Sequence, residues 1–143
     1  MTYPEKIAYL YRYRDALRRE KTIADEIEAL RTEATRVTQA LTGMPGGGDG
    51  QAIPRAVEQI TDAQQQLQEE AARAADARAS VCAAIGTVAD PLRRDILTRR
   101  YILGQRWERI AADHNVTLRW AAKQHHRTVE AMEISPENPE RVP

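Results

Sequence analysis

Aromatic residues are scarce in this chain and phenylalanine is absent. Aromatics make up 5% of the 143 residues, against 42% for hydrophobic residues as a whole, so burial has to come from Ala, Leu, Ile and Val at close helix contacts. The single cysteine, Cys82, excludes an internal disulfide and a CxxC metal pair, and we interpret it as a small apolar side chain. No run approaches the roughly 18 apolar residues of a membrane span, and the first residues lack the apolar core of a signal peptide. These absences predict a helical protein of the reducing cytoplasm with no membrane contact.

The residue patterns of catalytic and metal sites are also missing. The sequence shows no paired carboxylates and no activated nucleophile, and GGGDG at 46–50 lacks the following lysine of a phosphate-binding loop. His114 lies eleven residues before the next histidine, and His125 and His126 point to different faces of a helix, so the histidines do not form a zinc site. We therefore predict no enzyme, no cofactor and no metal.

Charge is balanced over the chain but unevenly distributed along it. Residues 91–134 carry nine Arg or Lys against five Asp or Glu, a net +4, whereas residues 1–90 carry eleven against fourteen, a net −3. Overall neutrality argues against indiscriminate nucleic-acid binding. The local excess of positive charge nevertheless singles out the C-terminal part as a candidate binding region.

Residues 1–89 are predicted to form an antiparallel helical hairpin. Up to Thr42 apolar residues recur every three or four positions, apart from one gap of six between Leu17 and Ile23, and no glycine intervenes, as on one face of a helix. Five glycines then interrupt the pattern, and we place a flexible turn at 43–52. The second helix, with Pro54 as its first residue, has a seam of heptad spacing made of Ile53, Val57, Ile60, Gln64, Leu67, Ala71, Ala74, Arg78, Val81, Ile85 and Val88. When the chain folds back at this turn, apolar residues of the first helix face seam residues of the second, and the residue numbers of each facing pair add up to 94 or 95. A nearly constant sum is expected of antiparallel helices.

A seam between two helices buries little surface, and its polar members weaken it or set its register. We therefore expect a second layer. A homodimer is the simplest form of that layer, and docking against the C-terminal domain is the alternative. Four early tyrosines at helical spacing are expected to pack the open end of the hairpin: Tyr3, Tyr9, Tyr11 and Tyr13.

Residues 90–134 carry the pattern of a helix-turn-helix unit. Asp90 before a proline starts a helix that ends at Gly104, and a short second helix follows. Asn115 is suited to a left-handed turn and Thr117 caps a last helix that runs to about residue 134. The predicted class is all-α, a hairpin followed by a three-helix unit, with a disordered, proline-containing tail at 135–143.

The last helix is expected to hold its cations outward. Its N-terminal half would enter the major groove of DNA, where Arg and Lys reach guanine edges or phosphates, and the outward side chains are Arg119, Trp120, Lys123 and Arg127. Cations of the first helix of this unit would contact the flanking backbone: Arg93, Arg94, Arg99 and Arg100. The alternatives are a merely solvated cationic face and, for Trp120, a place in the core.

The segment DILTRRYILGQRWERIAADHNVTLRWAAKQHHRTVEAME resembles the DNA-binding fourth region of bacterial sigma factors. Together with the hairpin and the LTGMPGGG turn, it is similar to a phage or prophage family of small sigma-region-four-like proteins grouped with RinA- and ArpU-type regulators. The resemblance implies that promoter DNA is read at Leu118, Arg119, Trp120, Ala122 and Lys123. The sequence departs from the pattern at Gln124, where an aliphatic core residue is usual, at Arg106, which replaces a hydroxyl cap, and at Ala122, which is too short to reach a base.

The first functional hypothesis is a DNA-binding transcriptional regulator of phage type. The resemblance implies the cytoplasm of a bacterial host, association with the nucleoid, double-stranded DNA as a partner, and a hairpin that dimerises or contacts RNA polymerase. A DNA-packaging component like a small terminase subunit is an alternative, because it also couples a helix-turn-helix to helical oligomerisation. A third hypothesis is an interaction protein that does not bind DNA.

Overall fold

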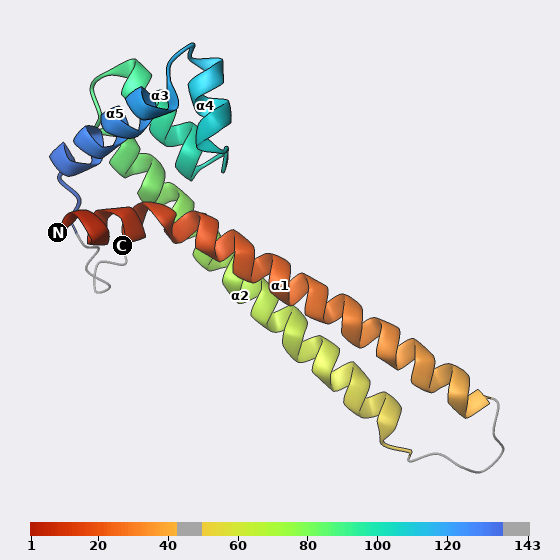
Figure 1. Cartoon of the computed structure of the whole chain (residues 1–143). Coiled ribbons are helices and arrows are strands. Elements are labelled where there is room, and N and C mark those ends of the chain that lie inside the picture. The colour runs from red at the N-terminus through yellow and green to blue at the C-terminus, as the bar shows by residue number, and fades with distance from the viewer. Residues whose placement is uncertain (43–49, 136–143) are drawn as a thin grey trace. The chain divides into compact units, whose positions relative to one another are not determined.

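The computed structural model describes residues 1–42 and 50–135, with backbone alone at 41 and 42, and this part of the chain is helical without strands (Figure 1). Its helices are α1 (Tyr3–Thr42), α2 (Ala52–Gly86), α3 (Pro91–Tyr101), α4 (Trp107–Asp113) and α5 (Leu118–Ala131). The all-α prediction is confirmed. Most of the predicted turn at 43–52 and nearly all of the predicted disordered tail at 135–143 lie outside the described residues.

The chain divides into two compact units, and the division does not follow the predicted domains. Unit 1 combines Met1–Asp15 with the chain from Ala74 onward, and unit 2 is Ala16–Arg73. Our expected boundary at residue 89 treated each long helix as part of one domain. The structure instead groups the first turns of α1 and the last turns of α2 with α3, α4 and α5.

Local hydrogen bonds explain where three of the helices begin. At α1, the Thr2 amide donates to Glu5 Oε2 at 2.7 Å and the Glu5 amide donates to Thr2 Oγ1 at 3.3 Å, a reciprocal capping box. Hydrogen bonds from Thr2 to the Glu5 carboxylate, first from its backbone amide and then from its side chain, hold the pKa of Glu5 below its usual value. At α3 the Leu92 amide donates to Asp90, and at α5 the Trp120 amide donates to Thr117. The predicted caps at Asp90 and Thr117 are confirmed.

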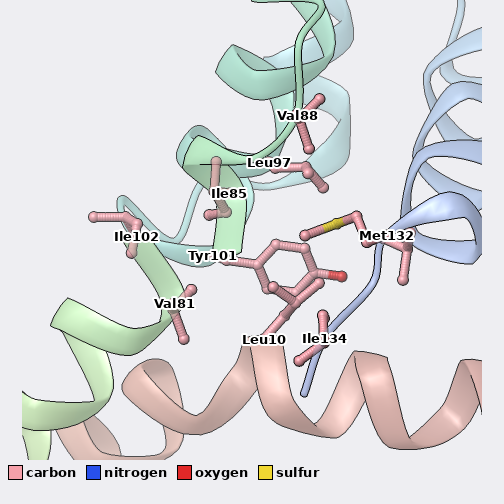
Figure 2. Packing of buried hydrophobic residues seen from close by; sticks show 10 residues of the cluster. Leu10, Val81, Ile85, Val88, Leu97, Tyr101, Ile102, Met132 and Ile134 are labelled. Carbon is pink, nitrogen blue, oxygen red and sulfur yellow. The ribbon is translucent and has the colours of Figure 1, made fainter. Parts of the chain in front are cut away.

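The core of unit 1 draws residues from four helices and from the segment after α5 (Figure 2). Its members are Leu10, Val81, Ile85, Val88, Leu97, Tyr101, Ile102, Val129, Met132 and Ile134. The early tyrosines pack against this cluster as expected, and Cys82 also lies at its edge, partly buried. The first turns of α1 therefore help to bury the helix-turn-helix region.

Unit 2 is much thinner, because α1 and α2 lie side by side there and run in opposite directions (Figure 1). Its buried hydrophobic residues are Ala16, Ile27 and Ala63. Glu70 is buried among them and accepts a hydrogen bond of 2.5 Å from Arg19 Nε and one of 2.9 Å from Arg73. The bond from Arg19 is the largest cause of a lowered pKa of Glu70, which is therefore ionised near neutral pH.

The predicted seam of α2 is wrong at five positions, because Ile53 and Val57 are exposed as well as three residues further along the helix. Gln64, Ala71 and Arg78 are exposed, and positions one residue earlier, Ala63, Glu70 and Ala77, are buried instead. Alanine lets two helices approach closely, so the face that packs against α1 is rotated toward the small side chains. Glu70, rather than Gln64 or Arg78, is the buried polar residue of this helix.

Candidate nucleic-acid interface

The candidate site starts from the turn between α4 and α5. Asn115 has a φ of +54°, the left-handed conformation that asparagine tolerates better than other non-glycine residues. The Val116 amide donates to the Ala111 carbonyl at 3.0 Å. Ala111 and Ala121 are both buried, so small side chains lie on both helices beside the turn. The predicted left-handed turn at Asn115 is confirmed.

Helix α5 has one buried face and one exposed face. Thr128 and Val129 are buried within it and Met132 just after it, while Arg119, Lys123 and Arg127 are all exposed. Because these three cations are four residues apart, they line one side of the helix over about 12 Å. Leu118, which is 48% exposed, and the exposed Ala122 lie at its N-terminal end. Trp120 is half-buried, and α5 ends at Ala131 rather than near residue 134.

The cations of the 91–134 segment fall into two groups. Within the described residues, four make no ion pair or side-chain hydrogen bond: Arg106, Arg119, Lys123 and Arg127. The others have partners in the fold: Arg93 with Asp90, Arg94 with the Val88 carbonyl, Arg109 with Asp113, and Arg99 and Arg100 as described below. Three of the four unpaired cations are on α5, so the positive charge available to a ligand is concentrated there.

Arg99 and Arg100, which we expected to contact the DNA backbone, are held inside unit 1. Arg99 Nε donates to Asp95 Oδ2 at 2.9 Å, and its Nη1 also contacts Asp113 and Gln105. Arg100 donates to Tyr11 Oη at 2.8 Å and to the Gln105 carbonyl. Asp95 lies four residues before Arg99 on α3, a spacing visible in the sequence. The contacts of Arg99 with Asp113 and of Arg100 with Tyr11 join different helices, and the sequence could not show these.

An aromatic cluster supports the inner face of α5. The Tyr101 hydroxyl and His125 Nε2 share a hydrogen bond of 2.6 Å, and the Trp107 ring meets the His125 ring edge-on at 4.8 Å between centroids. The Arg100 guanidinium lies over the Trp107 ring at 5.2 Å, a favourable cation–π position. Burial, and to a lesser extent the nearby charge of Arg100, lowers the pKa of His125 to about 4. The histidine is therefore neutral near pH 7 and serves the core.

The start of α1 fixes the other end of this helix. Lys6 Nζ donates to the Glu130 carbonyl at 2.8 Å, and the Tyr3 and His126 rings are 4.4 Å apart. Burial of Tyr3, with the Glu130 carboxylate nearby, raises the pKa of its hydroxyl. Contacts across more than a hundred residues thus hold the C-terminal half of α5, leaving its cations outside.

Two departures from the sigma-region pattern have structural outcomes. Gln124, where the pattern has an aliphatic core residue, is half-buried and is not among the buried polar groups that lack a partner. Arg106 occupies the N-cap position of α4 without a side-chain cap bond. Its exposed cation adds to the unpaired positive charge, a candidate that the sequence reading did not assign.

Other kinds of site find little support in the described residues. They contain no group of three or more His, Cys, Asp and Glu side chains placed to hold a metal ion. A pocket of about 540 Å³ lies between the segment before α3 and the end of α5. Its charged lining residues are Arg93, Asp90 and Glu133, so it does not extend the basic face. No helix in the described ranges has the length and apolar character needed to cross a membrane.

Comparison with protein-family models, with curated proteins and with solved structures finds no match to this chain. The functional argument therefore depends on the residues and contacts described above.

Proposed function

We propose that the chain is a DNA-binding transcriptional regulator of phage type that inserts α5 into the major groove. The observation that carries the proposal is the row of unpaired cations Arg119, Lys123 and Arg127 on the exposed side of a helix that follows a left-handed turn. The row is about 12 Å long, similar to the width of the major groove of B-DNA. The capped N-terminus of α5, with Leu118, would face base edges and thymine methyl groups.

The charges of the two units support the same assignment. Unit 1 holds fourteen basic and eleven acidic residues, a net +3, and unit 2 holds seven and ten, a net −3. Phosphate repels a negatively charged element, so unit 1 is the part that meets DNA. Unit 2 is then available to contact a second copy of the chain or RNA polymerase. We place this activity in the bacterial cytoplasm, at the nucleoid.

The proposal is tested by removing the unpaired cations. The triple variant Arg119→Ala, Lys123→Ala, Arg127→Ala is compared with Arg93→Ala, Arg94→Ala, Arg109→Ala, which loses the same charge from paired or hydrogen-bonded side chains. Binding to duplexes of about 20 base pairs is measured by fluorescence anisotropy at several salt concentrations. We expect the first variant to lose about 100-fold in affinity or more, and its salt slope to fall by about 3.

Equal losses in the two variants would show that net charge, not the face of α5, governs binding. If the wild-type chain does not bind DNA at low salt but is retained by RNA polymerase, the hypothesis of an interaction protein that does not bind DNA is favoured. A ring of many copies would favour the packaging component. Mapping the bound sites across a host genome then identifies the operator.

A further inference from the structure

Within unit 2, helix α2 presents three different faces. The first packs against α1 and carries the buried Ala63 and Glu70. The second carries the remaining charges of this part of the helix: Arg55, Glu58, Asp62, Glu69 and Arg73. The third, which we call the exposed strip, consists of Ile53, Val57, Ile60, Gln64, Leu67 and Ala71. At 100° per residue its centre lies about 80° from the packing face and about 180° from the charged face.

The exposed strip has the spacing of a coiled-coil seam, because its members alternate steps of four and three. The structure leaves it largely uncovered: Ile53 is 45% exposed and Val57 57%, and Gln64 and Ala71 are also exposed. Ile60 and Leu67 border on α1 and are half-buried. Helix α2 therefore carries a second seam, which α1 does not fill.

The order of residues in the strip is symmetric about position 62. In an antiparallel pair of identical helices, Ile53 faces Ala71, Val57 faces Leu67 and Ile60 faces Gln64, and each contact occurs twice. We propose that a second copy of this chain packs its α2 against α2 through this strip, forming an antiparallel two-fold dimer. An isologous interface needs such self-complementarity, and a large Ile53 opposite a small Ala71 gives interlocking layers.

Charge placement favours a second copy over another kind of partner. Unit 2 carries a net charge of −3, so two copies would repel if their charged faces met. The strip has no charged member, and its outer border is uncharged as well: Pro54, Thr61, Gln65, Gln68 and Ala72. In the two-fold pair all charges of the charged face point away from the contact. The strip is about 27 Å long, which is nearly the length of three heptads. An apolar seam sustained over about three heptads is typical of a coiled coil.

The first test uses two adjacent glutamines. Gln64 lies in the strip and Gln65 points about 100° further round the helix, and both are exposed, so neither change disturbs the packing against α1. Sedimentation equilibrium is measured without DNA from about 1 to 300 μM, the range of a weak dimer. We expect Gln64→Leu to tighten dimerisation about tenfold and Gln64→Arg to weaken it about tenfold, while Gln65→Leu and Gln65→Arg leave it unchanged.

The second test examines direction and register. Ile53→Glu and Ala71→Lys each place a charge in the strip, and in the antiparallel pair the two positions face one another. Each single variant should dimerise about tenfold more weakly, because its charge faces an apolar side chain. The double variant should recover most of the loss, since each charge then faces an opposite one. Full-length chain is used throughout, and circular dichroism confirms that every variant stays helical.

A wild-type chain and a Gln64→Leu variant that both remain monomeric would overturn the proposal. So would a dimer that responds equally to changes at Gln64 and Gln65, or a double variant weaker than either single one. Because no DNA is present, these outcomes are independent of whether the chain binds DNA. Conversely, loss of DNA binding in the α5 variant leaves the dimer measurement intact.

Discussion

The two units of this protein bury their residues in different ways. Unit 1 holds the largest fully buried side chains of the described chain: Tyr101, Leu10, Ile96, Leu97, Ile110, Val81 and Val129. Unit 2 buries two alanines, one isoleucine and a glutamate held between arginines. The difference teaches that a long helix can take part in a packed core at one end and in a thin pair at the other. It also accounts for where each function is proposed. DNA binding is assigned to unit 1, whose packed core holds α5 in place, and dimerisation to unit 2, where α2 has an apolar strip that α1 does not cover.

The contrast predicts very different costs for removing a buried aliphatic side chain. Leu10 is fully buried in unit 1 and Ile27 is nearly buried in unit 2. Leu10→Ala should cost about 3 to 4 kcal/mol because it leaves a cavity in a dense core, and Ile27→Ala about 2 kcal/mol because two helices can close around the gap. Urea unfolding gives the free energies, and hydrogen exchange assigns them to each unit. Equal losses would mean that unit 2 is as well packed as unit 1.

Acid should weaken unit 1 through His125. The pKa of this histidine is lowered from about 6.5 to about 4 in the folded state, so between these values the unfolded chain binds more protons. Stability is therefore full above pH 6.5 and falls by about 3 kcal/mol as the pH drops to about 4, with no further loss from this group below that value. Thermal unfolding from pH 4 to 7 measures the slope. His125→Gln removes the titrating group, and an unchanged slope in that variant would assign the effect elsewhere.

Backbone conformation gives the next largest effect, again in unit 1. Gly104 has a φ of +68°, and an added Cβ would meet the Arg14 guanidinium. Gly104→Ala should therefore cost about 1 to 2 kcal/mol, in addition to any displacement of the Arg14 side chain. Gly86 is the matched control, because nothing lies within 4 Å of a Cβ there. Thermal denaturation should show a lower Tm for Gly104→Ala alone, and similar values for the two variants would contradict the argument.

The smallest effect is expected in unit 2. Glu70→Gln removes the charge that Arg19 and Arg73 share, but both arginines are more than half exposed, so solvent screens the pair. Since the pKa of Glu70 is lowered, its contribution is present above the ordinary glutamate pKa and disappears as the pH falls through the folded value. Faster amide exchange confined to residues 16–73 is the expected signature. Glu69→Gln, one residue away and exposed, should not show it.

Several features of the fold could be read from the sequence because they are local. The caps at Asp90 and Thr117, the left-handed residues Gly104 and Asn115, and the exposed row of cations on α5 all depend on residues within a few positions of one another. Helix propensity and periodicity act over the same range, so the helices were located to within a few residues. The capping box at Thr2 and Glu5 has an equally local signature and was overlooked.

The remaining features were decided by tertiary contacts. The sequence contains two adjacent heptad seams on α2, and periodicity alone could not tell which one faces α1. One seam offers alanines, which allow close approach of the helices, and the neighbouring seam offers larger apolar side chains, so either face could pack against α1. Nor could it show that the Arg100 side chain has a partner in the fold, since that partner, Tyr11, is 89 positions away. The lowered pKa of His125 likewise depends on burial by other elements. By itself the sequence determined which residues could lie on a helix face, and the packing of distant segments determined which of those faces remain free.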